Sequence, residues 1–175
     1  MLRKINAGLS LICTCLIMGH AGINTVWMLS QGGFTKKPNP LGFILFGLMM
    51  AHAVISIVLA VLGRNGAEKR KCNSYSQLNV QTTIQRASGI LLIIFTALHV
   101  AGTIGILQPP PLVHAILPPL FFALSLMHVA VSTSKAFITL GIGNAKFVKV
   151  ADIVVKALCA VTLIASVIGF YLHLA

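Results

Sequence analysis

Acidic residues are almost absent from this sequence of 175 residues, which has only Glu68 and Asp152. Charged residues of both signs make up 9% of the chain, whereas soluble domains have about 25%. A water-soluble fold of this length has too little interior to bury a chain that is 57% apolar. The composition therefore indicates an integral membrane protein, because a bilayer removes the need to bury apolar surface.

Cysteine motifs and internal repeats are also absent. No C-x-x-C-H sequence occurs, so the usual attachment site of a c-type haem is missing. No repeat with a period of 20–50 residues is visible, which argues against a repeat architecture. We interpret the four cysteines as packing residues without disulfides. They are Cys13, Cys15, Cys72 and Cys159.

Five apolar runs are present, each near the ~20 residues that span a bilayer. They predict helices over approximately 5–29, 41–62, 86–107, 112–134 and 150–174. Because Pro118 and Pro119 fall early in the fourth run, its regular helix is expected to start only there and to extend past Ser134. The first run is too long for a signal peptide and is interpreted as a retained helix. We predict one all-α transmembrane domain over 1–175, with the first four helices forming an up-down bundle.

Basic residues give the chain a formal net charge of +11. These basic residues lie between the apolar runs. We therefore expect them to contact anionic lipid or an acidic protein rather than nucleic acid. Only Lys36 and Lys37 lie on one side of the predicted membrane. By the positive-inside rule, the N-terminus is then cytoplasmic and the C-terminus outside, in a cell inner membrane. The eleven on the inner side are Arg3, Lys4, Arg64, Lys69, Arg70, Lys71, Arg86, Lys135, Lys146, Lys149 and Lys156.

One histidine lies in the interior of each of the first four runs, at His20, His52, His99 and His128. Ionisable side chains at membrane depth are costly, and they indicate function by default. A single one is equally well explained as a neutral, hydrogen-bonded imidazole, but one in each of four successive helices is not. Carboxylates are missing beside them, apart from Asp152 at the entrance of the fifth run, so a hard-metal site or a carboxylate relay is disfavoured. Neutral imidazoles suit haem iron, and two per iron favour electron transfer over oxygen chemistry.

The depths of these histidines predict two haems stacked along the bundle. Counted from the nearest inner basic residue, His20 and His99 lie roughly 24 and 20 Å deep, and His52 and His128 roughly 18 and 10 Å. In an up-down bundle, the first and third helices lie on one diagonal and the second and fourth on the other. This predicts an outer haem between the first pair and an inner haem between the second.

The residues around the histidines suit a flat macrocycle. Small residues, which let it approach a helix, flank His20 and follow His99; they are Gly19, Gly22 and Gly102. Basic side chains near the inner surface are candidates to pair with haem propionates; they are Arg86, Lys135, Lys149 and Lys156. His114 and His173 fall at the outer boundary and are interpreted as interfacial rather than as ligands.

The segment Thr82-Thr-Ile-Gln-Arg86-Ala-Ser88-Gly89 precedes His99 by ten residues. It resembles the Ser-x-x-x-Arg-x-Ser/Thr-Gly stretch of cytochrome b membrane subunits in succinate dehydrogenases and fumarate reductases, with Thr82 in place of the first Ser. With five helices and one histidine in each of the first four, the likeness to the five-helix dihaem type covers nearly the whole chain.

The resemblance implies two haem b groups, one held by His20 and His99 and the other by His52 and His128. It also implies a flavoprotein subunit and an iron–sulfur subunit on the cytoplasmic side, exchanging electrons with menaquinone or ubiquinone. The chain would then be the non-flavin subunit of a quinone-linked oxidoreductase, with no catalytic residues beyond electron transfer. Thr82, Arg86 and Ser88 are implied as quinone or propionate contacts.

One departure concerns the outer surface, where dihaem members that oxidise menaquinol are expected to use a carboxylate. This chain has no Asp or Glu there, so water, His114 or a partner subunit would have to handle the proton. Two alternatives stay open: an anchor of another respiratory enzyme, such as a hydrogenase or formate dehydrogenase, and a haem-free transporter. Anchors of other respiratory enzymes often have two histidines on one helix, and no run here has two interior histidines. Transporters often have broken helices or a charge at the membrane midplane, and this sequence shows neither.

Overall fold

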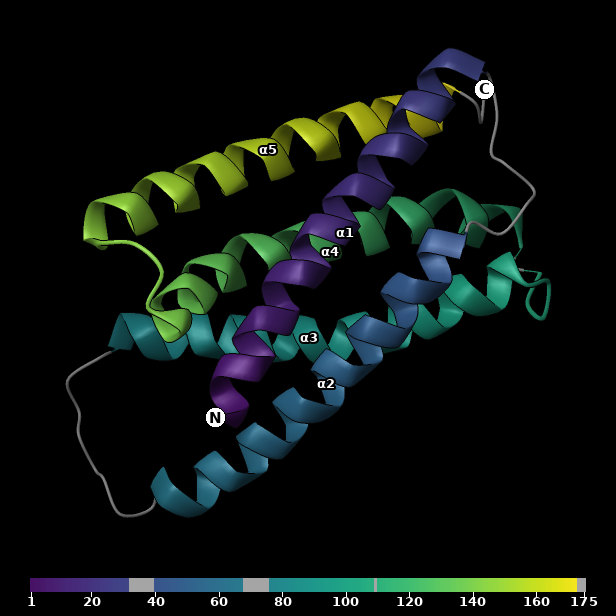
Figure 1. Cartoon of the computed structure of the whole chain (residues 1–175). Coiled ribbons are helices and arrows are strands. Elements are labelled where there is room, and N and C mark those ends of the chain that lie inside the picture. Colours follow the sequence, from purple (N-terminus) through teal and green to yellow (C-terminus); the bar gives the residue numbers. More distant parts are fainter. Residues whose placement is uncertain (32–39, 68–75, 109, 173–175) are drawn as a thin grey trace.

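The computed structural model describes residues 1–31, 40–67, 76–108 and 110–172, and within them every regular element is an α-helix (Figure 1). All five helices are long and apolar enough to cross a membrane, which confirms the predicted all-α, multi-pass architecture. The helices are α1 (Leu2–Gln31), α2 (Pro40–Ala67), α3 (Ser76–Thr103), α4 (Pro111–Leu140) and α5 (Ala145–Leu172).

The first four helices follow the predicted up-down order. Extensive contacts join α1 to α2, α1 to α4 and α3 to α4, whereas α2 and α3 touch only sparsely. Within the described residues, no backbone contact links α1 to α3 or α2 to α4, so these two pairs form the diagonals of the bundle. The fifth helix packs outside this group, against α4 and α1 (Figure 1).

Small and hydroxyl-bearing residues fill the helix interfaces, and large apolar residues cover the outside. The hydroxyls of Thr25 on α1 and Ser166 on α5 are hydrogen-bonded to each other in a buried position. Nearby, Gly169 lies where an added Cβ would be 3.4 Å from Met28. This arrangement is typical of membrane helices, which associate through close backbone approach and polar contacts rather than by hiding apolar surface from water.

α3 and α4 differ most from the sequence expectation, while α2 ends and α5 begins five residues beyond the expected bounds. α3 begins at Ser76, ten residues before the apolar run that predicts it, because its first turns are polar and leave no hydropathy signal. α4 is continuous from Pro111 to Leu140, with Pro118 and Pro119 inside it rather than at its start. Neighbouring groups in a membrane bundle can compensate the backbone hydrogen bonds that a proline removes, so the helix is not interrupted.

A glycine turn reverses the chain between α4 and α5. Gly141 caps α4 with φ 72°, and Gly143 follows with φ 75°, a region that other residues rarely adopt. An added Cβ on Gly143 would be 2.2 Å from the ring of Phe147. The side chain of Asn144 then accepts a hydrogen bond from the backbone N–H of Phe147 at 2.9 Å and starts α5.

These two glycines predict a graded loss of stability. Gly141→Ala introduces backbone strain alone, because its Cβ would meet nothing within 4 Å, and should cost about 1–3 kcal/mol. Gly143→Ala adds a clash with Phe147 and should be the more destabilised in thermal unfolding in detergent. Gly8→Ala, in a helix with open space, is the matched control and should unfold at or above the wild-type temperature. Equal midpoints for all three variants would contradict this account of the turn.

Candidate functional site

Two of the interior histidines, His20 on α1 and His99 on α3, share one cavity. The cavity has a volume of about 140 Å³ and mostly apolar walls, which come from all four helices of the bundle. The two rings are close enough to interact electrostatically. The structure therefore brings together the residues of one diagonal that the sequence pairs as the outer set.

Polar groups around this pair are only partly satisfied. Asn24, one turn along α1, is hydrogen-bonded to Nε2 of His20 at 3.0 Å. Nδ1 of His20 and Oγ1 of Thr96 are buried and have no hydrogen-bond partner among the described residues. The ring of His99 packs against Phe121, with centroids 5.2 Å apart. Unpartnered polar atoms in an apolar cavity are costly, so they mark a place where a ligand would be favourable.

Glycine gives room beside the first ring. A Cβ added to Gly42, at the start of α2, would be 3.7 Å from Cε1 of His20, which is ordinary contact distance. The three glycines singled out for macrocycle approach have nothing within 4 Å of an added Cβ. These are Gly19, Gly22 and Gly102.

The other two histidines, His52 on α2 and His128 on α4, come from the helices of the second diagonal and lie close enough for a charge on one to influence the other. His52 lies beside the backbone of Asn6 near the start of α1, and its Nδ1 is buried without a described partner. The amide of Asn6 in turn donates a hydrogen bond to Ser56 Oγ at 3.1 Å. This pair thus lies near the start of α1, whereas the cavity of the first pair reaches Gly42 at the start of α2. The two pairs occupy different heights along the bundle.

His128 is held by the segment that enters α3. Ser88 Oγ lies 2.8 Å from Nδ1 of His128, and Ser88 is only 1% exposed. The same hydroxyl donates to the carbonyl of Gln85 at 3.2 Å, so it is free to accept a hydrogen from Nδ1. With the proton on Nδ1, the lone pair of Nε2 is available to a metal. A Cβ on Gly89 would come within 3.3 Å of the ring, a tight contact that the ring could relieve only by shifting a few tenths of an ångström.

A cationic cluster adjoins this segment. Lys135 Nζ donates hydrogen bonds to Thr82 Oγ1 and to Gln85 Oε1, each at 3.1 Å. Arg86, which is exposed, interacts electrostatically with Lys135. In the part of the chain that the structure describes, the only ion pair joins Asp152 to Lys156, so no carboxylate offsets these two charges. The cluster can therefore attract an anionic group at this end of the bundle.

Sequence reasoning located the four histidines and Ser88 but missed several of their partners. It assigned Ser88 to a cofactor or quinone, whereas its hydroxyl contacts the ring of His128. The contacts of Asn6, Asn24 and Gly89 have no sequence signal beyond a polar or small residue in an apolar run. The side chain of His114 and the whole of His173 lie outside the described residues.

No compact protein-only metal site is formed, because no three His, Cys, Asp or Glu side chains among the described residues come together. The imidazoles occur in pairs instead. Comparisons with protein-family models, curated proteins and solved structures return no match. The chemistry of the chain therefore follows from its own residues and their geometry.

The Ser88–His128 contact predicts energetic coupling between α3 and α4. Ser88→Ala should lower the free energy of unfolding by about 1–3 kcal/mol, because a buried ring nitrogen loses its partner. A double-mutant cycle with His128→Phe, measured by chemical unfolding in detergent, should give a coupling energy of about 1 kcal/mol. Ser125, whose hydroxyl bonds only within α4 to Phe121, is the control. Its change to alanine should be additive with His128→Phe, and similar coupling for both serines would refute the contact.

Proposed function

We propose that this chain is a dihaem cytochrome b that anchors a complex of the succinate dehydrogenase or fumarate reductase type in the membrane. One observation carries the proposal: two pairs of interior imidazoles, each drawn from diagonally opposed helices, at two heights of the bundle. Such an arrangement is what two bis-histidine haems require, and a merely structural role for four histidines would not require diagonal pairing.

The donor chemistry of the residues fits haem iron. Nδ1 of His20 and of His52 is buried without a described partner, and the hydrogen bonds of Ser88 leave Nε2 of His128 available. Imidazole is a common ligand of haem iron, and among the described residues no group of three His, Cys, Asp or Glu side chains offers a different metal site. His20 and His99 would hold one haem b, and His52 and His128 the other. When bound, haem b supplies a one-electron redox centre.

The chain's own residues would tune and protect such centres. With two imidazoles held on each iron, His20 with His99 and His52 with His128, the groups would serve electron transfer rather than oxygen chemistry. Ser88 would fix the ring of His128 and, by accepting a hydrogen bond from its Nδ1–H, make Nε2 a stronger donor to a metal. The apolar cavity walls around His20 and His99, where the ring of Phe121 is tilted against that of His99, would limit the access of water.

The cationic end supports the proposed partners. Lys135 and Arg86 would pair with propionates or a quinone near Thr82, where Lys135 already donates to the Thr82 hydroxyl. An iron–sulfur subunit, carrying a flavoprotein, would dock on this basic side, which the positive-inside rule puts in the cytoplasm. Electrons would then pass between menaquinone or ubiquinone and the soluble subunits.

Spectroscopy tests the proposal directly. The purified chain should show a b-type α-band in the reduced-minus-oxidised spectrum, and pyridine haemochrome should give about two haems per chain. His20→Ala and His52→Ala should each remove one haem, because each takes away one axial ligand. His173→Ala, assigned to the boundary, is the matched control and should retain both. Absence of the α-band would contradict the proposal, and a value of one haem per chain would contradict the dihaem assignment.

A second test addresses the role of Ser88. Ser88→Ala should raise the midpoint potential of one haem and leave the other unchanged, because loss of the hydrogen bond makes His128 a weaker donor to ferric iron. Ser88→Thr, which keeps the hydroxyl, should behave as wild type. Redox titration by optical spectroscopy measures both potentials. Equal shifts of both haems, or a shift with threonine as large as with alanine, would contradict the assignment.

A further inference from the structure

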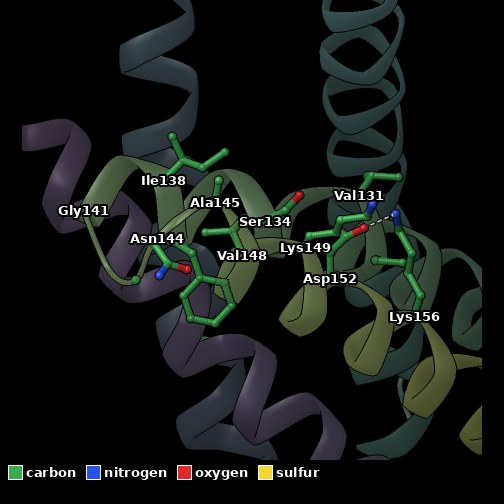
Figure 2. Close-up of a pocket in the computed structure, with 13 residues that line it drawn as sticks. Val131, Ser134, Ile138, Gly141, Asn144, Ala145, Val148, Lys149, Asp152 and Lys156 are labelled. Atoms are coloured by element: carbon green, nitrogen blue, oxygen red, sulfur yellow. Dashed lines mark hydrogen bonds and ion pairs between the residues drawn. The ribbon is translucent and has the colours of Figure 1, made fainter.

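A second hollow lies away from the histidines, between the facing ends of α4 and α5 (Figure 2). Its volume is about 480 Å³, and it adjoins the glycine turn. On α4 it reaches back from Gly141 to Ala130, and on α5 it runs from Ala145 to Lys156. Eleven residues of helix on each side correspond to roughly 16 Å of depth along the bundle.

Three charged side chains from α5 line this hollow: Lys149, Asp152 and Lys156. Their spacing of three and four residues puts them on one face of the helix (Figure 2). Asp152 and Lys156 form an ion pair at 2.5 Å. No described carboxylate pairs with Lys149, so the face keeps one uncompensated positive charge.

The opposite wall is apolar for much of its length. Val131 and Ile138 of α4 line it, with Ser134 as a polar interruption, and Val148 adds apolar surface on the α5 side. Lys149 is exposed and lines the hollow near the start of α5, so its charge can attract an anion there. A free inorganic anion would satisfy the charge but not the apolar wall, and a neutral quinone would satisfy the wall but not the charge. An amphiphile with an anionic head satisfies both.

We propose that this hollow binds an anionic phospholipid. The headgroup phosphate lies at Lys149, the charge without a described carboxylate partner, and an acyl chain runs along Ile138 and Val131. Basic pockets between membrane helices on the cytoplasmic side recognise lipid headgroups in this way. The lipid would fill the gap between α4 and α5 and thereby hold the fifth helix against the bundle. This inference does not rest on the proposed haems, because the hollow shares no residue with the histidine pairs.

Lipid binding to the full-length chain in detergent tests the proposal. Delipidated protein is titrated with phosphatidylglycerol, phosphatidylcholine or inorganic phosphate, and bound lipid is counted by native mass spectrometry. We expect one phosphatidylglycerol to bind in preference to phosphatidylcholine. Lys149→Gln should weaken that binding about fivefold, the effect of one lysine near an anionic lipid. Lys149→Arg should retain it, and circular dichroism verifies that each variant is folded.

Lys146 is the matched control, since it is an exposed lysine on the same helix, one turn earlier, and does not line the hollow. Lys146→Gln should bind phosphatidylglycerol as the wild type does. Equal weakening by Lys146→Gln and Lys149→Gln would show general surface attraction and overturn the site. Equal affinity for both lipids, or displacement of bound lipid by inorganic phosphate alone, would also overturn it. A failure here leaves the haem content untouched, so the two proposals are separable.

Discussion

The lack of water in the hydrocarbon core is the constraint on which the rest of this structure depends. A polar group at membrane depth has to find its partner within the protein or in a ligand. Thr25 meets Ser166, and Asn6 meets Ser56, so these contacts join α1 to its neighbours. The buried Nδ1 atoms of His20 and His52 have no hydrogen-bond partner among the described residues. This exception makes the histidines candidates for a functional role.

Antiparallel connection turns one histidine per helix into two facing pairs. Because consecutive helices are neighbours around the bundle, the first and third lie on one diagonal, and the second and fourth lie on the other. The same order sets the entry of α3 against α4, so that Ser88 and Gly89 meet His128. A short motif in one helix therefore acts on a histidine of another, and ring orientation depends on helix packing.

Scarcity of acids determines how the basic end behaves. With a single described ion pair, between Asp152 and Lys156, the positive charges of Lys135, Arg86 and Lys149 are left for other partners. Near α3 these charges suit propionates or a quinone, and between α4 and α5 they suit a lipid headgroup. The Lys135 cluster lies between α3 and α4 and the hollow between α4 and α5, so the proposed cofactor and the proposed lipid would not compete for one site.

The sequence alone determined the number of helices, their antiparallel order and the interior position of four histidines, because hydropathy and spacing act locally. It did not reveal that α3 begins at Ser76, or that α4 continues through Pro118 and Pro119, because polar turns and prolines give no membrane signal. The Ser88–His128 bond, the approach of Gly89 and the hollow beside Lys149 were decided only by tertiary structure. Each depends on the distance between two helices and their rotation about their axes, which a one-dimensional pattern does not encode.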